Sequence, residues 1–103
     1  MKFINLLTNI TKATSTQKKR ELWDIEGILN NQLFKFDLRP LRNNTKGGSF
    51  KTKADKIVYD MKDQYIIIDV EEFHQYLKDN QLKTATLKEL ISSLDWNIIL
   101  QKF

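Results

Sequence analysis

Hydrophobic residues at the start of the chain recur at spacings of three and four. They are Phe3, Leu6, Leu7, Ile10 and Ala13. This spacing puts them on one face of a helix, so it predicts a short amphipathic helix over 3–14, although several β-branched residues weaken it. Residues 14–20 are polar and basic and have no large hydrophobic side chain to bury. They predict a connector or an exposed helical turn.

From residue 22 the hydrophobic pattern changes to a period of two. Trp23, Ile25 and Leu29 alternate with acidic residues, and then Phe34, Phe36 and Leu38 alternate with charged ones. Alternation of this kind predicts two strands, and the polar segment 30–32 between them predicts the turn of a hairpin. A helix over 22–29 is the alternative, which Gly27 disfavours.

The second half of the chain predicts two more strands, two helices and a last strand. The strands cover 57–61 and 65–70, and the unbroken apolar run in the second indicates a central strand buried on both faces. A helix over about 71–79 follows, with Asp69 as its N-cap. Thr86 begins another capping motif and helix, and alternation over 96–100 predicts the last strand.

Together these elements predict one α+β domain over 1–103, in the order α-β-β-β-β-α-α-β. The sheet is expected to have about five strands, mostly antiparallel because short turns connect the early ones, with helices on one face. The two helices before the last strand allow that strand to run parallel to its neighbour. Within the domain, 1–20 forms the amino-terminal helix and basic connector, and 41–56 forms a basic loop that contains glycine.

The charge of the chain is unevenly distributed. The net charge is +4, but residues 1–59 carry 12 basic and 5 acidic side chains, a net +7, whereas residues 60–103 carry 5 and 8, a net −3. Such asymmetry indicates a basic surface that meets phosphates or an acidic protein. Lysines make up 14 of the 17 cations, which is also typical of a face that only keeps a protein soluble.

Composition excludes several kinds of chemistry. The chain has no cysteine and one histidine, so disulfides, thiolate metal sites and cysteine nucleophiles are absent. Lys46-Gly47-Gly48-Ser49 does not have the spacing of a phosphate-binding P-loop. We therefore expect no cofactor and no metal, and composition disfavours enzymatic activity without excluding it. Apolar runs are too short to cross a bilayer, so we expect no membrane partner and a cytoplasmic location.

The basic loop and the basic connector supply the candidate binding residues. The loop contributes Arg39, Arg42, Lys46, Lys51 and Lys53, and the connector contributes Lys18, Lys19 and Arg20. Cations interleaved with amides, hydroxyls and glycines can follow a phosphate backbone. The sequence therefore predicts a small non-enzymatic nucleic-acid-associated domain, without distinguishing DNA from RNA.

Two alternatives remain open. The first is a protein interaction module, such as an inhibitor, adaptor or subunit of a larger or viral assembly, which docks the basic face on an acidic partner. The second and weaker one is a small nuclease. Asp37, Asp60 and Lys62 can be fitted to a magnesium-dependent pattern with Asp69 or Glu71, and His74 is the one side chain suited to acid–base work near neutral pH.

Overall fold

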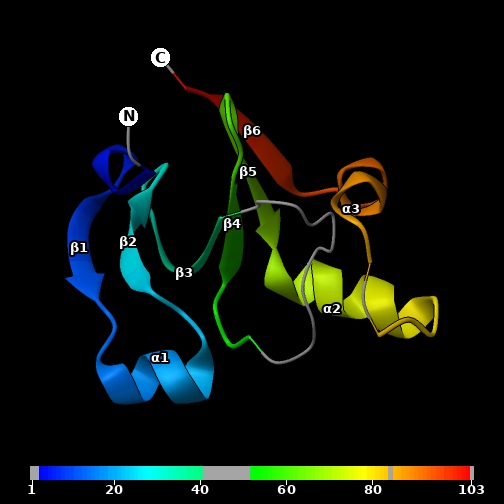
Figure 1. The fold of residues 1–103 in the computed structure, drawn as a ribbon, viewed down its shortest axis with the longest axis horizontal. Helices are drawn as coiled ribbons and strands as arrows, with labels where there is room; N and C mark the ends of the chain where they lie inside the picture. Colours follow the sequence, from blue (N-terminus) through cyan, green and yellow to red (C-terminus); the bar gives the residue numbers. More distant parts are fainter. Residues whose placement is uncertain (1–2, 41–51, 84, 103) are drawn as a thin grey trace.

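A six-stranded mixed sheet forms the centre of the fold, with its strands arranged in chain order from β1 to β6 (Figure 1). The structure is a computed structural model that describes residues 3–40, 52–83 and 85–102. Its elements are η1 (Phe3–Leu6), β1 (Thr8–Lys12), α1 (Ser15–Glu21), β2 (Ile25–Leu29), β3 (Gln32–Pro40), β4 (Lys56–Asp60), β5 (Gln64–Asp69), α2 (Val70–Asp79), α3 (Leu87–Ser93) and β6 (Asn97–Gln101). The predicted α+β class and single domain are confirmed, with one strand more than expected.

Four of the five strand pairs are antiparallel, and β3 with β4 is the parallel one. Parallel neighbours require a long connection, and residues 41–55 between these two strands are long enough to supply it. The mostly antiparallel sheet is therefore confirmed. The parallel pair lies elsewhere than expected, because β6 turns out to run antiparallel to β5.

The β2–β3 hairpin forms where the alternating pattern predicts it. Asn30 and Asn31 connect the strands with φ values of 52° and 66°, a left-handed conformation that asparagine tolerates better than most residues. Pro40 is the last residue of β3, as expected for a residue that donates no ladder hydrogen bond. The alternative helix over 22–29 is wrong.

The predicted helix over 3–14 is also wrong. A short 3-10 helix, η1, is followed by strand β1, which pairs with β2. Asn9 has a left-handed φ of 53°, which a continuous right-handed helix over 3–14 could not contain. The β-branched Thr8, Ile10 and Thr11 favour the extended strand. The basic segment after it forms the short helix α1, as the helical alternative for 14–20 predicted.

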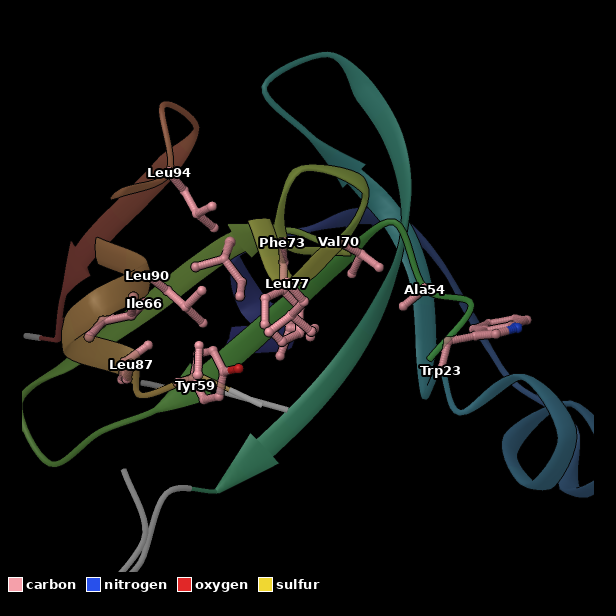
Figure 2. Close-up of a cluster of buried hydrophobic side chains, with 13 residues drawn as sticks. Trp23, Ala54, Tyr59, Ile66, Val70, Phe73, Leu77, Leu87, Leu90 and Leu94 are labelled. Carbon is pink, nitrogen blue, oxygen red and sulfur yellow. The ribbon is translucent and has the colours of Figure 1, made fainter. Parts of the chain in front are cut away.

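One face of the sheet is covered by α2 and α3. Side chains from β4 and β5 meet those of the two helices in a helix-side core (Figure 2). Its members are Trp23, Ala54, Ile57, Tyr59, Ile66, Ile68, Val70, Phe73, Leu77, Ala85, Leu87, Leu90 and Leu94. Figure 2 shows Trp23 and Ala54 at the end of this core nearest α1. Helices on one face are thus confirmed for α2 and α3.

The opposite face of the sheet has its own core, to which η1 contributes. Because successive strand residues point to opposite faces, Val58 and Ile67 belong to this core although their neighbours belong to the other. Phe3 packs edge-on against Phe36 and Tyr65, with ring centroids 5.2 and 5.6 Å apart. β5 is therefore buried on both faces, as its apolar run predicted.

Helices α2 and α3 begin at the predicted caps. The Asp69 carboxylate accepts from the Glu72 backbone N–H at 3.0 Å, and the Thr86 hydroxyl accepts from the Glu89 N–H at 3.2 Å. Such caps satisfy backbone donors that the first turn of a helix leaves unpaired. Among the described residues, no helix is long and apolar enough to cross a membrane.

Candidate nucleic-acid interface

Helix α1 is a basic helix that buries none of its side chains. A reciprocal capping box begins it: the Gln17 backbone N–H donates to the Thr14 hydroxyl at 3.1 Å, and the Thr14 N–H donates to the Gln17 side chain at 2.9 Å. Lys18, Lys19 and Arg20 occupy its last turn, where cations are favoured by the helix dipole. Hydrogen bonding and charge, rather than core packing, therefore keep this helix in place.

Residue 53 lies directly against the end of α1. The Lys53 backbone N–H donates to the Glu21 carbonyl oxygen at 2.8 Å. Two residues later, the Asp55 N–H donates to the Lys35 carbonyl oxygen at 2.8 Å, and the Asp55 carboxylate accepts from the Lys35 N–H at 2.8 Å. These bonds hold three segments of the chain that carry basic residues next to one another. Their cations, called the basic surface below, are Lys18, Lys19, Arg20, Lys35 and Lys53.

The acidic residues nearby are engaged within the protein. Asp24 forms an ion pair with Lys18 at 3.3 Å and accepts from the Leu38 backbone N–H at 2.7 Å. Glu21 accepts from the Trp23 indole N–H at 3.2 Å. In the described part of the chain, Lys19, Arg20 and Lys53 form no ion pair. Their charge is available to an anionic partner.

Lys35 is a member of the basic surface that sequence reasoning missed. Its ammonium lies 5.2 Å from the centroid of the Trp23 ring, and Trp23 itself is buried between the end of α1 and Ala54 (Figure 2). The alternating pattern of 34–39 indicates only that Lys35 lies on the strand face opposite to Phe34 and Phe36. Its pairing with Asp55, however, depends on contacts between distant segments that no local pattern encodes.

The Arg39 side chain forms an ion pair with a buried carboxylate of the protein itself. Its guanidinium donates to the buried Asp37 carboxylate from Nη2 at 2.8 Å and from Nε at 3.2 Å. Burial lowers the pKa of Arg39, but the hydrogen bond and the charge of Asp37 outweigh it, so this pKa is raised. Arg39 thus neutralises Asp37, while Arg42, Lys46 and Lys51 lie outside the described residues.

A polar cleft of about 600 Å³ adjoins the basic surface at Lys53. It lies between residues 52–56 and the start of α2, and Lys53, Lys78 and His74 are among its lining residues. Lys56 also lines it, and its side chain, only 7% exposed, pairs with Asp69 at 2.6 Å. His74 is half-buried beside the Phe73 ring, with centroids 5.7 Å apart.

Three of the four carboxylates considered for a nuclease have partners in the protein, and the fourth, Glu71, is exposed. Asp37 pairs with Arg39, Asp60 with Lys102, and Asp69 with Lys56 and the first turn of α2. Within residues 3–40, 52–83 and 85–102, no three Asp, Glu, His or Cys side chains gather as a metal site requires. The described residues therefore do not bring together carboxylates as metal-dependent cleavage requires.

Comparison with known proteins adds no further identification: no family model, curated protein or solved structure matches this chain. The class of protein is therefore defined by its fold and surface, as a small α+β domain with a basic face.

Proposed function

We propose that this protein is a non-enzymatic nucleic-acid-binding domain that contacts phosphates through its basic surface. The observation that carries the proposal is the hydrogen bond from the Lys53 N–H to the Glu21 carbonyl oxygen, because it holds the backbone of one loop lysine beside the end of the basic helix α1. Phosphate contacts by lysine and arginine position a protein on nucleic acid without reading its sequence. DNA and RNA are intracellular, so the proposal implies an intracellular protein.

The arrangement of charge supports binding as a use for these cations. Three of them, Lys19, Arg20 and Lys53, are exposed and form no ion pair within the described chain. Neutralising about three phosphates releases counterions, so the affinity for a duplex should fall about fortyfold between 50 and 200 mM salt. Trp23 is buried and Lys35 lies over it, so this ring offers no stacking platform for bases.

The experiment is fluorescence anisotropy with labelled single- and double-stranded DNA and RNA at a series of salt concentrations. The variant Lys19→Gln/Lys53→Gln should reduce affinity at least tenfold and lower the salt slope by about two. A matched control, Lys83→Gln/Lys88→Gln, removes the same charge from two exposed residues, one before α3 and one in it, and should leave binding unchanged. No binding at 50 mM salt, binding indifferent to salt, or equal effects of the two variants would each refute the proposal.

A protein interaction module is the second candidate function. The predominance of lysine over arginine favours it, since arginine is better suited to bidentate recognition of phosphate. In that case the same surface would dock on an acidic protein. Salt-sensitive binding of a polyglutamate peptide, lost in Lys19→Gln/Lys53→Gln, together with no binding of any nucleic acid, would select this function.

A further inference from the structure

The two edges of the sheet differ in how well they are protected. β1 and β6 are the outermost strands and lie on opposite sides of the fold (Figure 1). β1 carries a register shift between Thr8 and Thr11, a left-handed residue at Asn9, and Lys12 at its end. Bulges and lysines are devices by which proteins prevent an edge strand from pairing with another chain. The β1 edge is thus blocked.

β6 has none of these devices. Its sequence, Asn97-Ile98-Ile99-Leu100-Gln101, contains no charged residue and no proline, and its pairing with β5 runs without a register shift. Ile99 is 43% exposed, one of the most exposed large hydrophobic residues that the structure describes. An uncharged, regular edge strand with an exposed isoleucine is a template for a further strand.

The pairing with β5 shows which backbone groups of β6 face outward. The Lys102 N–H donates to the Asp63 carbonyl oxygen at 2.9 Å, so residue 102 directs its backbone groups toward the β4–β5 hairpin. In an antiparallel pair this direction alternates along the strand, and Ile98 and Leu100 therefore bond β5. Asn97, Ile99 and Gln101 therefore point their N–H and C=O groups to the open side, where the described chain has no further strand.

We propose that β6 is a homodimerisation edge, pairing antiparallel with β6 of a second copy about a two-fold axis at Ile99. The outward residues are self-complementary in this register: Ile99 faces Ile99, and Asn97 faces Gln101 of the second copy. Each of these three residues then donates and accepts one backbone hydrogen bond across the interface. A closed two-fold contact leaves neither β6 edge exposed.

Charge at the ends of β6 also favours the antiparallel orientation. Asp95, which precedes the strand, is exposed, whereas the Lys102 ammonium that follows it is paired with Asp60. Parallel pairing would place the two Asp95 carboxylates near each other, whereas antiparallel pairing separates them by the length of the strand. The exposed Ile99 side chains become cross-strand neighbours and are removed from water.

This interface is independent of the proposed function. The basic surface is built from α1, Lys35 of β3 and Lys53, and it contributes no residue to β6. Dimerisation can therefore be measured without nucleic acid, and its failure leaves the proposed binding function untouched.

The first test is sedimentation equilibrium of the full chain between 1 and about 200 µM. We expect a monomer–dimer equilibrium that Ile99→Lys weakens at least tenfold. Ile10→Lys is the matched control, because Ile10 is 39% exposed on the blocked edge, and it should not change the dimer. Thermal unfolding confirms that both variants are folded. A monomer at every concentration, or equal effects of the two variants, would overturn the proposal.

A second test exploits the absence of cysteine in the chain. In the proposed register the two Ile99 Cα atoms are about 5.5 Å apart, a separation that suits a disulfide. Ile99→Cys should therefore form a covalent dimer under mild oxidation, whereas Gln101→Cys, which faces Asn97, should form several-fold less. If Gln101→Cys cross-links as readily as Ile99→Cys, or if neither does, the two-fold register at Ile99 is excluded.

Discussion

Lys56 and Asp69 lie opposite each other on β4 and β5 and form an ion pair, with Nζ 2.6 Å from Oδ1. The Lys56 ammonium also lies 3.8 Å from the centroid of the Trp96 ring and 4.7 Å from that of Phe34. The second Asp69 oxygen caps α2. This pair therefore connects the sheet to the beginning of α2 and to the residue that precedes β6.

We expect Lys56→Met to lower the free energy of unfolding by about 2 kcal/mol. The substitution keeps the buried stem but leaves the Asp69 carboxylate, 24% exposed, without its cation and removes the contacts with both rings. Urea denaturation measures the change. Lys53→Met is the matched control on an exposed side chain and should stay within about 0.5 kcal/mol of the native chain. Equal losses in the two variants would contradict the role given to Lys56.

Local patterns predicted much of what surrounds this ion pair. The strands on either side of the β4–β5 turn and the capping role of Asp69 follow from apolar runs and capping residues, which act within a few positions. The ion-pair partner of Asp69 could not be predicted from such local patterns. Lys56 looked like one more cation of the basic loop, because the register that sets it opposite Asp69 depends on how two strands pair.

The wrong prediction of a helix over 3–14 and the missed contacts at the candidate site have the same physical origin. The spacing of Phe3 and Leu7 suits a helix, and both residues are indeed buried on one side, but β1 pairs with β2 and that pairing outweighs local helical periodicity. At the candidate site, the cations of α1 were recognisable from sequence. Their meeting with Lys53 and Lys35 was not, because it rests on backbone hydrogen bonds between distant segments.

Tyr59→Phe should leave the protein as stable as the native chain, or more stable by up to about 1 kcal/mol. The Tyr59 side chain is fully buried, and its hydroxyl has no hydrogen-bond partner in the described residues (Figure 2). An unpaired buried hydroxyl loses its hydration on folding and gains no bond in return. Thermal and urea unfolding measure the effect. Tyr76→Phe, which removes a hydroxyl that donates to Glu89, is the control and should not stabilise the protein.

The same hydroxyl makes stability fall at alkaline pH. Burial raises the pKa of Tyr59 above its ordinary value, so the phenol keeps its proton in the fold at a pH where the unfolded chain releases it. Its contribution is constant below the unfolded pKa of about 10 and is lost as the pH rises above that value. Between pH 9 and 11, the native chain should therefore lose more stability than Tyr59→Phe. Parallel curves would contradict this assignment.

Glu72→Gln should destabilise the junction between α2 and β6 by about 1 kcal/mol. The Glu72 carboxylate accepts from the Trp96 backbone N–H at 3.1 Å and from the Asp95 N–H. A neutral amide accepts more weakly and has one oxygen instead of two. Urea unfolding measures the loss. Glu71→Gln, on the exposed neighbouring position, should have no effect beyond about 0.5 kcal/mol.

Thr14→Ala should loosen α1 without lowering the stability of the whole protein. The capping box begins this seven-residue helix, which buries no side chain, so losing the cap exposes no apolar surface. A cap is worth about 1 kcal/mol, and exchange of the Lys18 amide, bonded to the Thr14 carbonyl at 2.9 Å, should accelerate about fivefold. Hydrogen exchange by NMR measures this change.

Thr86→Ala is the matched control for that variant, because Thr86 forms the same capping box at the start of α3. α3 buries Leu87 and Leu90 in the helix-side core, so loss of its cap should lower the free energy of global unfolding by about 1 kcal/mol.

The effect of the two variants on nucleic-acid affinity should be the reverse of their effect on stability. Thr14→Ala disorders the helix that presents Lys18, Lys19 and Arg20 and should weaken binding several-fold, whereas Thr86→Ala should leave binding unchanged. Equal affinities of the two variants would show that α1 need not be folded for binding.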